Sequence, residues 1–281
     1  MKAGKQWGLV GAGGVNQSFV AGMPALLGRL GPVKGSSLRI SRRIANGFSA
    51  GDAIARYREL QPCGCIWIMA PEDTLDRLTA EMAEEVRLRD KMVVVCGALG
   101  DSQRFSPLRS AGARIATLNC VPEADERVFV AEGHPAVLAM LRKDLASDGR
   151  KLIELRPGKK ALYLSGIHLG AHLLTPWIAG AAESFRAAGF SRAEAIRLTQ
   201  ALGSNALRGY AMAGDRAWSH AGAEPLARTI DAGMDTIRTA DPWLAALHGV
   251  SAELLRGLAR KKISSAAAAK LSVKLVARKA S

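Results

Sequence analysis

The chain has 281 residues, which is long enough for two domains and a sizeable core. Apolar residues make up 48% of it and aromatic residues only 5%, so the core must be built from aliphatic side chains, as in α/β layers and packed helices. The net charge of +14 would suit a nucleic-acid partner. However, more than half of the excess lies between Arg256 and Ser281, a basic stretch without acids, which is typical of a solvated tail.

An apolar run at residues 7–10 predicts a short buried strand, and glycines follow it directly. Apolar residues then recur at helical spacing from Val15 onward. A strand, a glycine turn and a helix form the context in which backbone N–H groups bind a pyrophosphate. The cofactor-binding residues predicted here are Gly11, Ala12, Gly13, Gly14, Val15 and Asn16. Asn16 stands where this pattern usually has Gly or Ala. The alternative is a strand-turn-helix connection that binds no ligand.

Strands and helices alternate through the first half of the chain. Apolar runs predict strands at residues 7–10, 37–41, 65–70, 92–96, 114–118, 127–131 and 151–155. Helical patterns lie between them at about 15–29, 50–59, 73–89, 105–111 and 135–147. The fold class predicted is therefore α/β: an N-terminal, doubly wound, mostly parallel Rossmann sheet, followed by an all-α C-terminal domain.

Ligands of such sheets bind at the carboxyl ends of the strands, so the residues after each strand are candidates. Ser41, Arg42 and Arg43 follow the predicted second strand, and two guanidinium groups suit the 2′-phosphate of NADP(H). The alternative is that both arginines are exposed to solvent at the end of the strand and bind no ligand. Ala70, Pro71 and Gly97 follow the next two strands, and these small residues would let a flat ring lie against the backbone.

Strand signals end near Pro157, and residues 161–182 contain no charged side chain. This length could span a membrane, but polar residues interrupt it, so we predict a helix buried on all sides. Ser165, His168 and His172 would share one face of that helix. We predict that they face the cofactor and act as catalytic residues, since histidine exchanges protons near neutral pH. Histidines bonded within the core are the alternative.

The remaining chain predicts further helices. Ser191 and Glu194 form a capping box for a helix that runs to about Ala213, and two more helices start near Pro225 and Pro242. The predicted domains are residues 1–157 for NADP binding, 158–260 for substrate and dimer contacts, and a basic tail at 261–281.

The cysteines match no zinc pattern, and each lies in or beside an apolar run. We therefore expect free thiols in a reducing cytosol, and no metal site. No signal peptide is visible at the N-terminus, so the expected location is cytoplasmic, without a membrane anchor. The four cysteines are Cys63, Cys65, Cys96 and Cys120.

Four motifs together resemble a known family. Gly-Leu-Val-Gly-Ala-Gly-Gly-Val, Ser-Arg-Arg, Ile-Trp-Ile-Met-Ala-Pro-Glu-Asp and Val-Val-Val-Cys-Gly-Ala-Leu look like the Rossmann-like domain of pyrroline-5-carboxylate reductases and β-hydroxyacid dehydrogenases. Lys160-Ala-Leu-Tyr163 before a long apolar stretch is similar to a subgroup with a helical domain related to that of 6-phosphogluconate dehydrogenase. The resemblance covers roughly residues 6–255.

This resemblance implies NADP(H) binding and a homodimer built through the helical domain. Its members carry a His after the position of Tyr163 and an Asn near position 172, where this chain has Leu164 and His172. The leading hypothesis is an NADP(H)-dependent oxidoreductase that acts on a small carbonyl, imine or hydroxy-acid substrate in the interdomain cleft. A non-catalytic NADP(H)-binding module, such as a redox sensor or assembly partner, is the second hypothesis. Nucleic-acid binding by the basic tail is the third.

Overall fold

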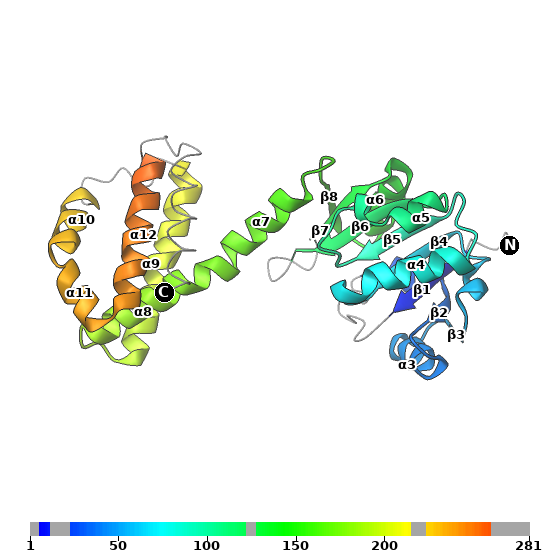
Figure 1. Cartoon of the computed structure of the whole chain (residues 1–281), viewed down its shortest axis with the longest axis horizontal. Coiled ribbons are helices and arrows are strands. Elements are labelled where there is room, and N and C mark those ends of the chain that lie inside the picture. The colour runs from blue at the N-terminus through cyan, green and yellow to red at the C-terminus, as the bar shows by residue number, and fades with distance from the viewer. Residues whose placement is uncertain (1–5, 12–22, 122–127, 215–222, 260–281) are drawn as a thin grey trace. The chain divides into compact units, whose positions relative to one another are not determined.

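The structure is a computed structural model that describes residues 6–11, 23–121, 128–214 and 223–259. It divides into two compact units, Met1–Ile167 and His168–Ser281. Figure 1 shows the sheet of the first unit and the helices of the second. The two units are described separately below.

An eight-stranded sheet forms the centre of the first unit, in the order β3-β2-β1-β4-β5-β6-β7-β8. Strands β1 to β6 pair in parallel with one another, whereas β7 pairs antiparallel with β6 and parallel with β8. The mostly parallel Rossmann-like sheet predicted from the sequence is confirmed. The strands are β1 (Trp7–Gly11), β2 (Leu30–Lys34), β3 (Asp52–Ile54), β4 (Cys65–Met69), β5 (Met92–Cys96), β6 (Arg114–Cys120), β7 (Val128–Gly133) and β8 (Lys151–Glu154).

Helices cover both faces of this sheet, because each central strand is apolar on both sides. One buried cluster joins the sheet to α2 (Pro24–Leu27), α3 (Leu38–Phe48) and α6 (Pro135–Ser147). The second cluster lies on the other face and includes residues of α4 (Leu75–Glu85) and α5 (Ser106–Ser110). Short 3-10 turns connect these elements at η1 (Tyr57–Leu60), η2 (Glu72–Thr74) and η3 (Ser102–Arg104).

The predicted strand at 37–41 is wrong, since these residues enter helix α3. Ser37 caps that helix by accepting a hydrogen bond from the amide of Ile40, and Ser41, Ile44 and Ala45 are buried at helical spacing. The second strand is instead β2, whose Pro32 lies next to an irregularity in the register with β1. Proline in a strand is tolerated at such irregularities.

Two further predicted helices differ from the structure. Residues 50–59 were expected to be helical, but they contribute the short strand β3 and the start of η1. Of the predicted helix at 15–29, the structure describes only the part that forms α2, because residues 12–22 lie outside the described residues.

The apolar segment 161–182 is not one helix. Helix α7 (Lys160–Gly170) is followed by η4 (His172–Leu174) and then by α8 (Thr175–Ala187). Pro176 lies in the first turn of α8 and has no N–H to continue a helix from α7. The segment is also not buried, since Lys160 is the buried residue of α7 and Gly180 that of α8.

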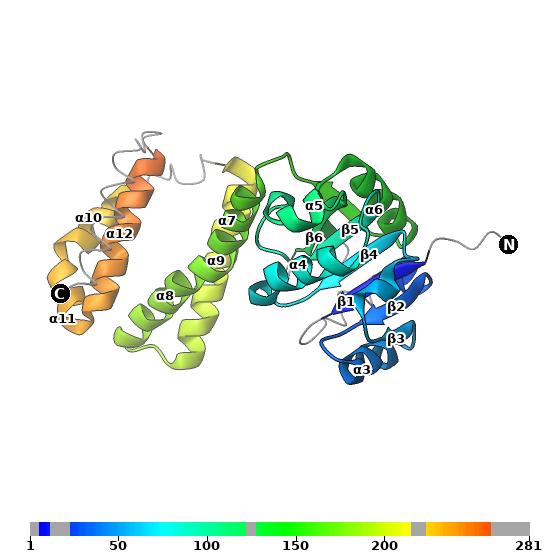
Figure 2. The same ribbon diagram turned by 45° about the vertical axis from the view of Figure 1, so that its right-hand side comes forward.

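The second unit is helical, as predicted. Its α8 lies beside α9 (Arg192–Ala213), as Figure 2 shows, and α9 begins at the predicted capping box of Ser191 and Glu194. Gly180 of α8 lies against Leu247, which brings α8 close to α12 (Pro242–Ala259). The other helices are α10 (Ala223–Ala232) and α11 (Met234–Ala240). In the described part of the chain, no helix is long and apolar enough to cross a membrane.

Candidate active site

The carboxyl ends of the central strands form one row across the sheet. Gly11 of β1 pairs with Met69 of β4, Met69 pairs with Cys96 of β5, and Cys96 pairs with Leu118 of β6. The strand order reverses between β1 and β4, because β2 and β3 lie on one side and β5 and β6 on the other. In open α/β sheets, this is the place where ligands bind.

Several of the predicted cofactor residues come together at this row. Gly11 ends β1, Ala70 and Pro71 follow β4, and Gly97 follows β5. The predicted residues Ala12, Gly13, Gly14, Val15 and Asn16 lie outside the described residues. Gly97 has a φ of +74°, and a Cβ built there would meet no atom within 4 Å. The backbone after β5 therefore faces open space, into which a flat ring could pack.

An arginine holds the loops after β4 and β5 together. Arg104 donates to both carboxylate oxygens of Asp76, each at 2.9 Å, and also contacts Glu72. Glu72 in turn accepts a hydrogen bond from the amide of Leu99 at 2.9 Å. The Arg104 guanidinium lowers the pKa of Asp76, mainly through these hydrogen bonds. This bidentate contact fixes the two loops that border the row.

The predicted 2′-phosphate residues lie elsewhere than expected. Ser41 is buried, and its hydroxyl accepts from the amide of Gly35 and donates to the carbonyl of Ile54, both at 2.8 Å. Ser41 therefore lies inside helix α3 and not, as the sequence had predicted, at a strand end. Arg42 and Arg43 are exposed in α3, beyond its first turn.

The residues that do follow β2 are Gly35, Ser36 and Ser37, with Arg39 in the first turn of α3. Lys34 ends the strand, but it is buried and its ammonium lies 4.6 Å from the centre of the Tyr57 ring. At this strand end, the exposed polar groups are therefore two serines and Arg39.

The predicted catalytic residues are all exposed. Ser165 and His168 lie in α7, and His172 lies in η4. Ser165 belongs to the first unit and both histidines to the second. The two imidazole rings are in contact, with their centres 5.4 Å apart. The alternative of histidines bonded within the core does not apply in this structure, because both side chains are exposed.

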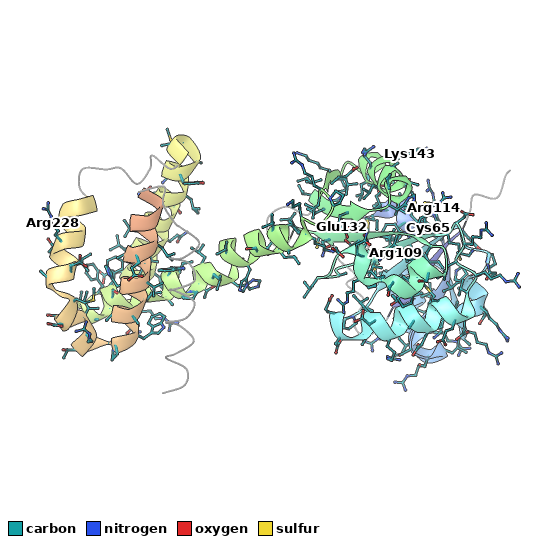
Figure 3. The ribbon with its side chains drawn as sticks, turned by 45° about the horizontal axis from the view of Figure 1, so that its top comes forward. Cys65, Arg109, Arg114, Glu132, Lys143 and Arg228 are labelled. Carbon is teal, nitrogen blue, oxygen red and sulfur yellow. The ribbon has the colours of Figure 1, made fainter. Side chains whose placement is uncertain are left out.

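A buried lysine lies at the same end of the sheet. Lys160 is 3% exposed, and its Nζ donates to Thr117 Oγ1 at 2.7 Å. Thr117 pairs with Val95, one residue before the carboxyl end of β5. Its hydroxyl donates to Glu132 Oε1 at 2.7 Å, and Glu132, labelled in Figure 3, comes from β7. A continuous hydrogen-bonded path thus joins the ammonium to a carboxylate.

Glu132 is fixed by its other partners. Its Oε1 accepts from the Ser102 amide at 2.7 Å and its Oε2 from the Ser102 hydroxyl at 2.9 Å. Desolvation lowers the pKa of Lys160 to about 8, while the negative charges of Glu132, Glu72 and Asp101 act in the opposite direction. This buried ammonium can therefore exchange a proton near neutral pH.

Tyr163 follows Lys160 by one helical turn. Its hydroxyl is buried and finds no hydrogen-bond partner among the described residues. Burial raises its pKa, and Cys120, the last residue of β6, adds to the effect. Buried hydroxyl groups are nearly always bonded, so an unpaired one calls for an explanation.

Few sequence signals pointed to these residues. In the sequence, only the family resemblance points to Lys160 and Tyr163, although a lysine that opens an apolar helix is unusual. Thr117 lies inside an apolar strand, and Glu132 directly follows the apolar run Val128–Ala131. An acid next to a buried strand is a usable signal, because it must find a partner in the core.

The cysteines are free, as predicted, and three of them are buried. Burial raises the pKa of all four thiols, which leaves them protonated and weakly reactive at neutral pH. Within the described residues, no group of three His, Cys, Asp or Glu side chains could hold a metal ion.

No family model and no curated protein matches this chain in sequence. Solved structures do match in fold. An imine reductase from Myxococcus stipitatus in complex with NADP+ is 16% identical, with a TM-score of 0.61, and the match covers 90% of this chain and 92% of that one. An imine reductase from Bacillus cereus is 15% identical, with a TM-score of 0.60, and the match covers 92% and 93%.

A pyrroline carboxylate reductase from Plasmodium falciparum, with NADP bound, is 10% identical. Its TM-score is 0.55, and the match covers 92% of this chain and 99% of that one. The chain shares the fold of these reductases. The resemblance stated from the motifs is thus confirmed at the level of the fold.

Proposed function

We propose that the chain is an NADP(H)-dependent oxidoreductase that acts on a small carbonyl, imine or hydroxy-acid substrate. The observation that carries the proposal is the row of strand ends where the strand order reverses. Gly11 ends β1 there, and Ala70 and Gly97 directly follow the neighbouring ends of β4 and β5. The open space at Gly97 fits a nicotinamide ring, and the glycines that follow Gly11 fit a pyrophosphate. Bound NADPH would supply a hydride, which is the chemistry of the cofactor itself.

For the 2′-phosphate, we propose the first turn of α3, where Ser36, Ser37 and Arg39 follow β2. The N-terminus of this helix favours an anion, and a guanidinium can bind a phosphate through two hydrogen bonds. Arg42 and Arg43, the residues predicted from the sequence, lie further along the same helix and remain a second candidate for this contact.

The predicted proton donors His172 and His168, with Ser165 nearby in sequence, also remain candidates. Their exposure and the contact between the two rings support a role outside the core. A non-catalytic NADP(H)-binding module is the alternative function. It is supported by the absence of the His and Asn that the resembling family carries at the positions of Leu164 and His172.

Fluorescence titration with NADPH, followed by a turnover assay, tests the proposal. We expect binding and oxidation of NADPH with aldehydes, oxo acids or cyclic imines. Tight binding without turnover on any of these classes would favour the non-catalytic module. Absence of NADPH binding would contradict both functions.

We further propose a homodimer through the helical unit. Helix α9 is exposed along most of its length, with the side chains of Leu202, Leu207 and Tyr210 more than half exposed. Met212 near its end is 90% exposed. An apolar surface of this kind is unusual for a monomer in water, and a second copy of the chain could cover it.

A further inference from the structure

We propose that a cleft beside β6 and β7 binds a small zwitterion, namely an α-amino acid with a short aliphatic side chain. The cleft has a volume of about 220 Å³, and its lining residues all belong to the first unit. The inference concerns a second site and does not depend on the proposed function.

The cleft lies away from the row of strand ends. Its floor includes Ile115, the second residue of β6, and Ala113, which comes just before that strand. Ile115 lies three residues before Leu118, the member of the row in β6, and so about 10 Å from it along the strand. A ligand in the cleft and a nucleotide at the row would therefore occupy different places.

The size and the apolar part of the lining limit the ligand. A water molecule occupies about 30 Å³ in the liquid, so the cleft holds about seven waters or a small molecule in their place. Drug-sized ligands usually occupy pockets of about 300–1,000 Å³. Ala113, Ile115 and Pro157 contribute hydrocarbon surface to the cleft. These features favour a ligand with a short aliphatic group.

Two hydrogen-bond donors line the rim of the cleft. Arg109 and His134 are both exposed there. The guanidinium of Arg109 donates to the carbonyl of Ser102 and to oxygens of Gln103, which leaves part of its five N–H donors for a ligand. His134 Nδ1 accepts from the amide of Ala136 at 3.2 Å, so the proton of the neutral ring lies on Nε2. These two donors suit a carboxylate group.

An acid lines the same cleft. Asp101 accepts a hydrogen bond from the Gln103 amide at 3.0 Å with one carboxylate oxygen, and the other oxygen has no such partner among the described residues. Arg109 contacts the carbonyl of the same Gln103, so the two opposite charges lie about one residue apart. In this part of the chain, they form no ion pair with each other. The carboxylate and the ammonium of an amino acid can lie between them.

The charges around the cleft favour a ligand without net charge. Glu132, labelled in Figure 3 and 5% exposed, lines the cleft, and its negative charge acts on the buried ammonium of Lys160. Asp101 and Arg109 add one charge of each sign. An anion such as phosphate would be repelled by the two carboxylates, and a cation by the two basic groups. A zwitterion can place each of its charges beside the opposite one.

Isothermal titration calorimetry with L-valine is the primary test. We expect saturable binding, and at least about tenfold weaker binding of isobutylamine, which lacks the carboxylate, and of isovalerate, which lacks the ammonium. Saturating NADPH should leave the L-valine affinity unchanged. Absence of binding with L-alanine, L-valine and L-leucine up to about 10 mM would overturn the inference. Equal affinity for either analogue, or displacement by NADPH, would overturn it as well.

Variants locate the site. Asp101→Asn keeps an oxygen for the Gln103 amide but removes the charge, and Arg109→Gln removes the guanidinium. Each should weaken L-valine binding at least about tenfold. Arg114→Gln is the matched control, because this neighbouring arginine pairs with Asp90 at 2.7 Å and does not line the cleft (Figure 3). Unchanged affinity in Asp101→Asn, or an equal loss in Arg114→Gln, would overturn the assignment even if Arg109→Gln failed to fold.

Discussion

The hydroxyl of Ser41 donates a hydrogen bond of 2.8 Å to the carbonyl oxygen of Ile54, and so ties α3 to the end of β3. Ser41 Oγ also accepts a hydrogen bond from the amide of Gly35, which follows β2. One side chain thus fixes the loop where we propose that the 2′-phosphate binds. We expect Ser41→Ala to lower the free energy of unfolding by about 1–3 kcal/mol, since buried groups lose their partner.

Urea unfolding checks this expectation, with Arg42→Ala as the control. Arg42 is the next residue in the helix and is exposed, so its truncation should change the stability by less than about 0.5 kcal/mol. Equal stabilities for both variants would show that the Ser41 bonds contribute nothing measurable.

Cofactor preference gives the second prediction. We expect NADPH to bind at least tenfold more tightly than NADH, which corresponds to about 1.4 kcal/mol and is within reach of one charge-assisted contact. Arg39→Ala should remove most of this preference while leaving NADH affinity nearly unchanged. Fluorescence titration measures both constants.

The double variant Arg42→Ala with Arg43→Ala separates the two candidate sites on α3. If only this double variant weakens NADPH, the contact lies where the sequence predicted it. Equal affinity for NADPH and NADH in the parent protein would contradict both assignments.

The sequence predicts the features that depend on neighbouring residues, but not those that depend on contacts between residues far apart in the chain. The glycines after β1 and the small residues after β4 and β5 were recognisable, because strand ends are marked by local pattern. Strand β2 was missed because Gly31 and Pro32 suggest a loop, and only pairing with β1 and β3 makes them a strand. The burial of Lys160 was not predicted, because its partner Thr117 is 43 positions away in the sequence.

Lys160 also gives a prediction on stability and pH. Its pKa in the folded protein is about 8, below its ordinary value of 10.5, so the unfolded chain binds its proton more tightly. The unfolded state therefore holds more protons between about pH 8 and 10.5, and stability must rise with pH across this window. Below about pH 8 the lysine is charged in both states, and its burial lowers the stability by a constant amount.

The measurement compares the parent with Lys160→Met, which lacks this titration. Between about pH 7.5 and 9.5, we expect the parent to gain on the order of 1–2 kcal/mol relative to the variant. Urea unfolding followed at Trp7 and Trp67, both in the sheet, reports on this unit when the tryptophans of the helical unit are replaced. A difference that stays constant with pH would mean that the Lys160 pKa is not lowered.

Oligomeric state is the fourth prediction. Light scattering at micromolar concentration should give about 59 kDa, twice the chain mass of 29.7 kDa. Leu207→Glu should shift the mass toward the monomer, because it places a charge on the exposed apolar surface of α9. Thr236→Glu, at an exposed position of α11, is the control and should leave the mass unchanged. A mass near that of one chain for the parent protein would reject the dimer.

The last prediction concerns His168 and His172, whose rings touch but whose side chains are exposed. We expect His168→Ala and His172→Ala each to change the free energy of unfolding by less than about 0.5 kcal/mol, since neither truncation leaves a buried partner unpaired. Thermal melting of the two variants, with the double variant for their mutual contact, checks this. A loss of about 1–3 kcal/mol in either single variant would show that the histidine is a structural residue.

Turnover then decides what these histidines do, because stability is no longer a confounding cause. A loss of about 10²-fold or more, with NADPH affinity unchanged, would assign proton transfer to the histidine, as the sequence predicted. Retained turnover, together with a loss in Lys160→Met, would assign it to the lysine by the sheet. The pH profile adds a check on the lysine, since a donor with a pKa of about 8 loses its proton, and with it the activity, above that pH.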